Sequence, residues 1–255
     1  MVAASAVEFR EVSYRLPGGR LLLDRVSLAV DAGTTVALLG RSGSGKTTLL
    51  RTVNGLHAIT AGEVRVRGRS VAQQDTIALR RSIGYVIQET GLFPHFSVER
   101  NVGLLLELEG QPRAVVRKRA RALLEMVGLD PEEYAARMPY ALSGGQRQRV
   151  GLARALAAGQ DILLMDEPFG ALDPVTRAEM HDVLRVLTRR GQGNPTTVLL
   201  VTHDLEEALY LADRIVLLDD GRVAADVAAD DLLSSALPAV EAYVRAARRG
   251  TGART

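Results

Sequence analysis

Residues 34–56 read TTVALLGRSGSGKTTLLRTVNGL and contain three segments of different character. The first, 34–39, is a short apolar run with β-branched residues, which predicts a buried strand. A glycine-rich loop follows over 40–47, and the apolar spacing after it predicts a helix. The order of strand, glycine-rich loop and helix is typical of a site that binds phosphate groups.

The loop itself, GRSGSGKT at 40–47, fits the phosphate-loop pattern G-x-x-x-x-G-K-[S/T]. Its glycines allow successive backbone N–H groups to point at phosphate oxygens, and the helix that follows presents its positive end to them. We expect Lys46 to reach the β- and γ-phosphates and the Thr47 hydroxyl to bind Mg²⁺. A glycine-rich turn that fits the pattern by chance is the alternative, and the flanking strand and helix argue against it.

The chain after residue 160 alternates short apolar runs with helix patterns. The apolar runs lie at 162–166, 196–202 and 214–220, and helical spacing is found near 174–190 and 204–212. Strands that alternate with helices form a mainly parallel sheet with helices on its faces. The expected fold class is therefore α/β.

Two other regions have different patterns. Residues 7–16 and 21–30 alternate apolar with polar residues on either side of Gly18-Gly19, which predicts antiparallel strands with one solvated face. From 97 to 159 the apolar spacing is helical, with breaks at glycines and prolines. We expect this all-helical segment to be inserted between strands, after a buried strand at 82–88.

The composition excludes several classes of protein. Of 255 residues, 47% are apolar and 24% are charged, which is ordinary for a globular protein and argues against disorder. The net charge of +2 and the 4% of aromatic residues give no support to nucleic-acid binding. The chain has no Cys, so thiolate metal sites and disulfides are excluded. No apolar run approaches 18 residues, and Glu8 and Arg10 interrupt the start, so we expect neither a membrane span nor an export signal.

The run ILLMDE at 162–167 ends in two carboxylates. Asp166 would lie at the carboxyl edge of the sheet, where it can hold Mg²⁺ through water or Thr47. Glu167 would point in a neighbouring direction, which suits a general base that polarises the attacking water. Seen alone, such a pair is ordinarily interpreted as a solvated strand end. The phosphate loop upstream favours the catalytic interpretation instead.

Three further features have a structural and a functional interpretation each. His203 follows the strand 196–202, so it can be a structural side chain or a sensor of the γ-phosphate. Gln88 ends the strand 82–88 and can contact the metal or the water. LSGGQ at 142–146 precedes a helix with Ser143 as its expected N-cap, and it forms a second anion-binding device or a simple turn. Two half-sites in one chain suggest that two copies share each nucleotide.

Taken in order, GRSGSGKT, Gln88, LSGGQ, ILLMDE, Ala171-Leu172-Asp173 and His203 resemble the Walker A, Q-loop, signature, Walker B, D-loop and H-loop motifs of the ATP-binding cassette (ABC) transporter ATPases. The resemblance covers residues 7–225. It implies a P-loop NTPase with a RecA-like core, an antiparallel β subdomain and a helical subdomain at about 89–160. One cassette domain would then span 1–240, followed by a basic tail at 241–255.

The resemblance also implies roles for individual residues. Catalytic roles fall to Glu167, His203 and Gln88, and metal binding falls to Thr47, Gln88 and Asp166. The residues implied to bind ATP are Gly40, Arg41, Ser42, Gly43, Ser44, Gly45, Lys46, Thr47, Thr48, Ser143, Gly144, Gly145, Gln146 and Asp173. The implied activity is ATP hydrolysis with Mg²⁺, in which ATP closes a homodimer and hydrolysis opens it.

The stretches 88–102 and 166–177 look most like the ATP-binding subunits of bacterial importers for osmoprotectants such as glycine betaine, carnitine or choline. This similarity implies a peripheral subunit on the cytoplasmic face of the inner membrane. Its partners would be a permease, which docks near 89–96, and indirectly a solute-binding protein, with no nucleic acid. An importer for another small solute and a soluble ABC ATPase outside transport are the alternatives.

The chain departs from the family pattern in two places. Leu16 stands where the family has an aromatic residue that stacks on adenine, and Tyr14 lies two residues earlier on the same strand face, so either can pack on the base. Many osmoprotectant ATPases carry C-terminal regulatory domains, whereas this sequence stops at Thr255, so we expect no such sensing domain.

Overall fold

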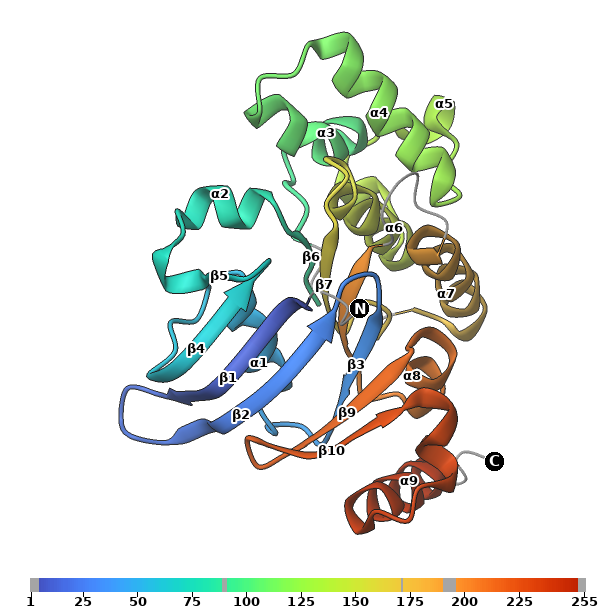
Figure 1. The fold of residues 1–255 in the computed structure, drawn as a ribbon. Helices are drawn as coiled ribbons and strands as arrows, with labels where there is room; N and C mark the ends of the chain where they lie inside the picture. The colour runs from blue at the N-terminus through green and yellow to red at the C-terminus, as the bar shows by residue number, and fades with distance from the viewer. Residues whose placement is uncertain (1–4, 89–90, 171, 190–195, 252–255) are drawn as a thin grey trace.

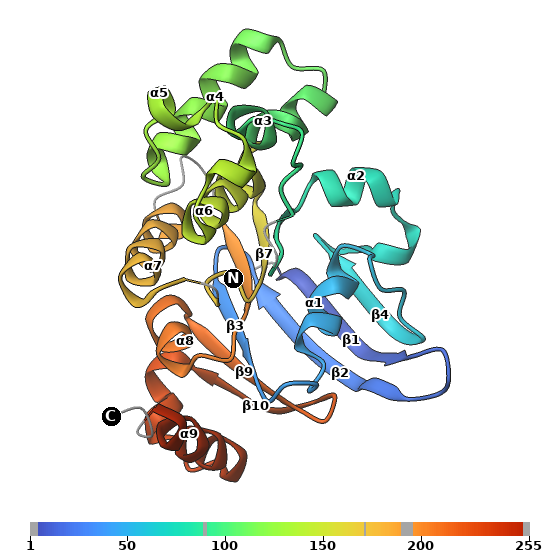
Figure 2. The same ribbon diagram turned by 180° about the vertical axis from the view of Figure 1, so that it is seen from behind.

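Two β-sheets lie on either side of helix α1 (Lys46–Val53), as the ribbon in Figures 1 and 2 shows. The computed structural model describes residues 5–88, 91–170, 172–189 and 196–251. Apolar side chains from both sheets and from α1 form one buried cluster, which includes Leu49, Leu50 and Val53 of the helix. The helix that follows the glycine-rich loop is thus held on two sides.

The larger sheet has six strands in the order β10-β9-β3-β8-β7-β6. The strands are β3 (Thr35–Leu39), β6 (Gly84–Val86), β7 (Ile162–Asp166), β8 (Thr197–Val201), β9 (Arg214–Asp219) and β10 (Arg222–Ala228). All neighbouring pairs are parallel except β9 and β10. Every residue of β3, β7 and β8 is buried, as expected for central strands covered by helices on both faces. Their carboxyl ends therefore meet at one edge of the sheet.

The smaller sheet is antiparallel, in the order β2-β1-β4-β5. It consists of β1 (Ser5–Arg15), β2 (Leu21–Asp31), β4 (Ala61–Val66) and the short β5 (Arg69–Ser70). The alternating burial along β2 matches the alternating polarity of its sequence, since one face packs on the core and the other faces solvent. Gly18 and Gly19, which join β1 to β2, have φ values of 103° and 95° that favour glycine.

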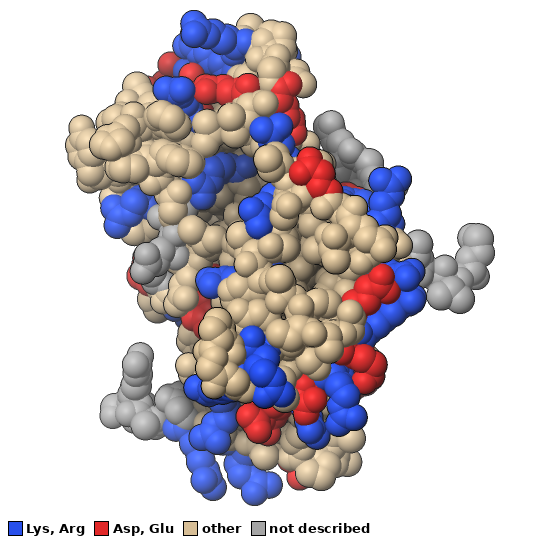
Figure 3. Space-filling view, turned by 90° about the vertical axis from the view of Figure 1, so that its left-hand side faces the viewer, with Lys and Arg blue, Asp and Glu red and all other residues tan. Residues whose placement is uncertain are grey.

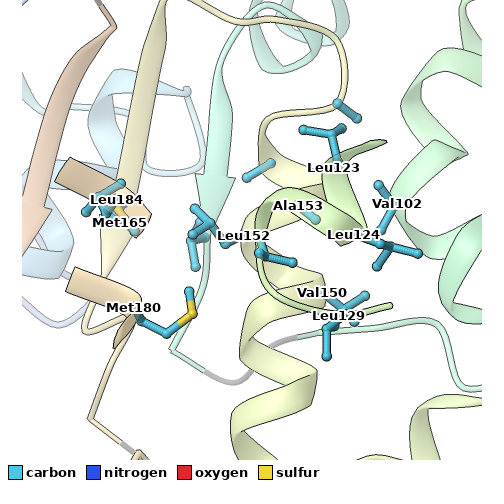
Figure 4. Packing of buried hydrophobic residues seen from close by; sticks show 14 of the residues in the cluster. Val102, Leu123, Leu124, Leu129, Val150, Leu152, Ala153, Met165, Met180 and Leu184 are labelled. Atoms are coloured by element: carbon cyan, nitrogen blue, oxygen red, sulfur yellow. The ribbon is translucent and has the colours of Figure 1, made fainter. Parts of the chain in front are cut away.

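The helical segment joins two neighbouring strands of the larger sheet, β6 and β7. It contains α3 (Val98–Leu108), α4 (Arg113–Met126), α5 (Pro131–Tyr134) and α6 (Gly144–Ala155). Leu123, Leu124, Val150 and Leu152 of these helices pack in one cluster with Met165 of β7, as Figure 4 shows. The insertion is therefore continuous with the core of the sheet.

A third cluster covers the other part of the sheet. Helices α8 (Leu205–Leu211) and α9 (Pro238–Thr251) contribute apolar residues that pack against β3, β9 and β10. Val240 of α9 is 1% exposed. The helix begins before residue 240, where the cassette domain was predicted to end, and continues beyond it. The remaining helices are α2 (Thr76–Arg81), α7 (Pro174–Arg189) and the 3₁₀ turns at Val71–Gln73, Pro139–Ala141 and Ala229–Ser234.

The structure confirms the predicted α/β fold with an antiparallel sheet and a helical insertion. Helix α2 and strand β10 were not predicted from the sequence. Helix α2 has only six residues and is capped by Asp75, and β10 pairs with β9 as an antiparallel edge strand. In the described part of the chain, no helix is both long and apolar enough to cross a membrane.

The charged residues are mixed over the side of the molecule that carries α2 and the smaller sheet. Figure 3 shows Lys and Arg interspersed there with Asp and Glu, and separated by uncharged residues. Several ion pairs link oppositely charged neighbours, such as Arg65 Nε with Glu63 Oε2 at 2.8 Å. Exposed pairs of this kind contribute little to stability, so the core clusters must carry most of it.

The packing predicts the effect of removing one leucine from the inserted helices. Leu124 is 0% exposed, so Leu124→Ala leaves a cavity and should lower the free energy of unfolding by about 2–5 kcal/mol. Leu108→Ala, at a position 57% exposed, should change it by less than about 0.5 kcal/mol. Urea unfolding followed by circular dichroism measures both; equal effects would contradict the described core.

Candidate functional site

The loop at 40–47 connects the carboxyl end of β3 to the start of α1. At two of its glycines there is no space for a side chain. A Cβ on Gly40 would lie 2.2 Å from the carbonyl oxygen of Leu218, and one on Gly45 would lie 2.7 Å from that of Leu22. Their φ values are 148° and 100°. The glycines are therefore required by both conformation and space, which explains why the motif tolerates only glycine there.

Lys46 is folded back over this loop. Its Nζ donates hydrogen bonds to the carbonyl oxygens of Gly40, at 2.8 Å, and Arg41, at 2.9 Å. The residue is 6% exposed, and burial lowers the pKa of its amine. Two neutral carbonyls hold the charge at the position that a phosphate group would approach.

The first turn of α1 is bonded to the end of β7. Thr47 Oγ1 donates to Asp166 Oδ1 at 2.6 Å, and one turn later Arg51 Nη2 lies 3.3 Å from Asp166 Oδ2. Asp166 is 1% exposed, so Thr47 and Arg51 supply the polar partners that water does not. Thr48, the third residue of α1, is half-buried beside Thr47.

Glu167 lies one residue beyond the strand, between two side chains from other connections. Its Oε2 accepts a hydrogen bond from Gln88 Nε2 at 3.4 Å and lies 3.4 Å from His203 Nδ1. Glu167 has a φ of 47°, a backbone conformation uncommon outside glycine, and its N–H donates to Val201 O at 2.9 Å. This turn directs the carboxylate away from the buried strand and toward the site.

The structure thus brings Lys46, Thr47, Gln88, Asp166, Glu167 and His203 together at the carboxyl edge of the larger sheet. Because the strands are parallel, residues that follow β3, β6, β7 and β8 meet there. This convergence agrees with the expectation drawn from the sequence for all six residues. The roles assigned to them remain predictions.

The segment 142–146 builds the start of α6. Ser143 Oγ accepts from the N–H of Gln146 at 3.2 Å, and Gln146 Oε1 accepts from the N–H of Ser143 at 2.9 Å. Gln146 Nε2 also donates to the Tyr134 hydroxyl at 3.1 Å. This reciprocal capping box fixes the helix start, as the sequence predicted for Ser143.

The same segment lies close to the chain that follows Glu167. A Cβ on Gly145 would lie 3.1 Å from Thr176 Cγ2 and 3.3 Å from Leu172 Cδ2, so glycine permits the close approach of α6 to α7. Asp173 caps α7, because its Oδ1 accepts from the N–H groups of Val175 and Thr176. The hydrogen bond from Thr176 lowers the pKa of Asp173. Ala171, part of the predicted D-loop, lies outside the described residues.

The two candidates for adenine stacking differ in their surroundings. The ring of Tyr14 stacks on His57, with centroids 5.1 Å apart and planes 7° apart. Leu16 follows the end of β1 and is 36% exposed. One face of Tyr14 is therefore already covered, while the Leu16 side chain is open to a partner.

The polar atoms of the site suit a nucleotide with a hard cation. Ser44 Oγ is buried and has no hydrogen-bond partner among the described residues, so it is available to a phosphate oxygen. Thr47 and Asp166 present a hydroxyl and a carboxylate, the oxygen ligands that Mg²⁺ prefers, usually with waters and substrate phosphates completing its shell. No group of three or more His, Cys, Asp or Glu able to hold a metal occurs in the described ranges.

Some contacts of the site were not predicted from the sequence. Arg51 pairs with Asp166 and also donates through Nε to the Tyr85 hydroxyl at 3.2 Å. The only signal for Arg51 is its spacing of four residues from Thr47, which puts both on one helix face. Tyr243 of α9 donates to the carbonyl oxygen of His203 at 3.4 Å, and burial raises the pKa of its phenol.

The sequence of the chain matches a known protein family. A family model described as ABC transporter matches residues 23–170, more than half of the chain. The chain belongs to the ABC transporter family. The match begins in β2 and ends just after Glu167, so it includes the phosphate loop, the helical insertion and the β7 carboxylates.

Curated relatives within this family include subunits of uptake systems. The choline transport ATP-binding protein OpuBA of Bacillus subtilis is 43% identical over 222 residues, which cover 87% of this chain and 57% of that protein. The glycine betaine uptake system ATP-binding protein YehX of Escherichia coli is 44% identical over 221 residues, which cover 85% and 69%. The chain thus matches little more than half of the length of OpuBA.

A solved ABC cassette shares the fold over almost its whole length. The ATP-binding cassette MJ0796, in a dimeric post-hydrolysis state bound to ADP and Pi, has a TM-score of 0.80 and 35% identity. The similarity covers 88% of this chain and 98% of that one. The chain therefore has the fold of an ABC ATPase cassette, as predicted from the sequence.

The position of Lys46 predicts the result of its removal. Lys46→Ala should weaken ATP binding about 10- to 100-fold, because a hydrogen bond to a charged group contributes roughly 1.5–3 kcal/mol. Titration with ATP by calorimetry measures the change. Lys118→Ala, which removes the charge of an exposed lysine on α4, is the control and should bind ATP like the parent chain. Unchanged affinity in Lys46→Ala would contradict the phosphate-loop assignment.

Proposed function

We propose that this chain binds and hydrolyses ATP as the energising subunit of a membrane importer for a small solute. The observation that carries the hydrolytic part is the place of Glu167. Its carboxylate lies between Gln88 and His203, one residue after the aspartate that bonds Thr47 of the phosphate loop. A carboxylate at this position faces the end of a bound triphosphate, where a water must attack.

Each residue has a defined part in this proposal. The loop N–H groups of 40–47 and Lys46 bind the phosphates of ATP, and Ser44 Oγ adds a donor. Thr47, Asp166 and Gln88 would hold Mg²⁺, which when bound neutralises charge on the phosphate oxygens. Glu167 accepts a proton from the attacking water. His203 and Gln88 keep the Glu167 carboxylate pointed at that water through Oε2.

We further propose that two copies of the chain sandwich ATP. The phosphate loop supplies one anion-binding helix start, and Ser143, Gly144, Gly145 and Gln146 supply another at α6. The close approach of Gly145 to Leu172 and Thr176, which leaves little room for a larger side chain, links this second device to the segment that begins at Glu167. The dimeric state described for MJ0796 supports the same arrangement here. Asp173, at the start of α7, would communicate between the two sites.

The transport role is proposed from the names of the relatives. In this proposal other subunits select the solute, so the site described above does not identify it. OpuBA is named for choline transport and YehX for glycine betaine uptake, and both solutes are quaternary amines. We therefore propose a quaternary-amine osmoprotectant as the solute. The chain would work at the cytoplasmic face of a bacterial inner membrane, with its helical insertion against the permease and a solute-binding protein as an indirect partner.

The geometry of Glu167 predicts how its amide variant behaves. Glu167→Gln keeps the size and hydrogen bonding of the side chain but cannot take the proton, so ATP turnover should fall about 100-fold or more while ATP still binds. Release of phosphate measures turnover, and calorimetry measures binding. Glu179→Gln on the exposed side of α7 is the control and should hydrolyse ATP at the parent rate. Undiminished turnover in Glu167→Gln would remove Glu167 from this role.

Uptake in cells tests the solute. A strain that lacks this gene should lose uptake of radiolabelled glycine betaine or choline, and the parent chain, but not Lys46→Ala, should restore it. Immunoblots confirm that both chains are present at equal amounts. If uptake of neither solute depends on the chain while the purified protein hydrolyses ATP, the quaternary-amine proposal fails and the ATPase assignment stands.

A further inference from the structure

A buried glutamate with an unsatisfied oxygen lies behind the Glu167 carboxylate. Glu207, in the first turn of α8, is 5% exposed. Its Oε2 lies 3.4 Å from Nε2 of His181 on α7, whereas its Oε1 is buried and has no hydrogen-bond partner among the described residues. Buried carboxylate oxygens are nearly always bonded, so a partner for Oε1 is required.

A donor in the same place is also unsatisfied. Arg177 on α7 lies 3.3 Å through Nη1 from Asp204 Oδ2, and its Nη2 donates to the carbonyl oxygen of Leu172 at 3.2 Å. Its Nε is buried and has no partner within the part of the chain that the structure describes. A guanidinium Nε–H can only donate, so an acceptor is needed opposite it.

Both unsatisfied residues line one small cavity. The cavity has a volume of about 20 Å³ and lies between the connections after β7 and β8. Its walls are Glu167, Gly170, Arg177, Thr202, His203, Asp204 and Glu207. None of these residues belongs to the phosphate loop, whereas Glu167 and His203 belong to the proposed hydrolytic site, so the cavity adjoins that site on the side away from the loop residues.

The size and polarity of the cavity select its occupant. One water needs about 10–15 Å³ of such volume and two to four polar partners, and an empty cavity of this size is expected only where the walls are apolar. A water can accept from Arg177 Nε and donate to Glu207 Oε1, which satisfies both groups. Its remaining hydrogen-bonding capacity is available to the wall formed by Glu167 and His203.

We propose that one ordered water occupies this cavity and that Glu207 acts through it as a positioning residue for Glu167 and His203. The inference rests on the proposed function, since it assumes that these two residues act on ATP. Asp204 connects the parts, because it bonds Arg177 and also caps α8 through the N–H groups of Glu206 and Glu207. These bonds of Asp204 fix the connection that carries Glu167 relative to the connection that carries His203, on the side of the cavity.

The test compares two variants of Glu207 by structure and by kinetics. Glu207→Gln retains an oxygen for the water, so it should keep the water and a kcat within about threefold of the parent value. Glu207→Met has similar volume but no strong acceptor, so it should lose the water and about tenfold in kcat, with KM for ATP unchanged, as one to two hydrogen bonds are lost. High-resolution crystal structures show the water directly. A residue that only supports folding would lower the melting temperature in both variants without this split in kcat.

A control and a second route keep the test decisive. Glu206→Met, on the exposed neighbour in the same turn, should leave kcat unchanged. If Glu207→Met does not fold, Arg177→Lys replaces it, since lysine preserves the charge facing Asp204 but lacks an Nε–H toward the cavity. Arg177→Lys should lose the water and lower kcat by a similar factor.

Three results would overturn the inference: absence of the water from the parent structure, a parental kcat in Glu207→Met, or an equal loss of kcat in Glu207→Gln and Glu207→Met. The last would assign the effect to the charge of Glu207. If the parent chain itself does not hydrolyse ATP, the proposed function fails, and the crystal structures alone still decide whether the water is present and depends on Glu207.

Discussion

The hydrogen bond from Thr47 Oγ1 to Asp166 Oδ1, 2.6 Å long, is the interaction on which the arrangement of the site depends. Asp166 ends a fully buried strand, and an unpaired carboxylate there would be strongly unfavourable. Thr47 and Arg51 satisfy its two oxygens from successive turns of α1. The helix is therefore fixed in rotation as well as position on β7. Every group that follows β7 is in turn placed relative to the phosphate loop.

The sheet explains why a large insertion does not disturb this geometry. The helical segment leaves after β6 and returns to β7, and these two strands are neighbours with Gly84 opposite Leu163. A Cβ on Gly84 would lie 2.5 Å from the carbonyl oxygen of Ala155, so the end of α6 packs directly on the strand. Leu152 of α6 and Met165 of β7 belong to one buried cluster. The insertion therefore cannot tilt relative to the sheet without disturbing this shared core. Movement of α6 would therefore be transmitted to the strand that carries Asp166.

The sequence was sufficient to predict the fold and the residues that meet at the sheet edge, because those depend on local pattern. Buried runs such as ILLMD and glycines such as Gly40 are restricted by the backbone alone. It was not sufficient for contacts that tertiary packing decides. Tyr14 stacks on His57, which is 43 residues away in the chain, and Arg51 donates through Nε to the hydroxyl of Tyr85 on β6. Neither pairing has a periodic signal.

The interactions of the site in this structure also indicate what a nucleotide must replace. Lys46 is held by two neutral carbonyls, and burial lowers the pKa of its amine although the charges of Glu167 and Asp166 act in the opposite direction. A phosphate group would exchange weak acceptors for a charged one, and such charge-assisted bonds are the stronger kind. The side chain is already aligned with the loop, so little conformational freedom is lost on binding. The buried lysine is thus preorganised for an anion.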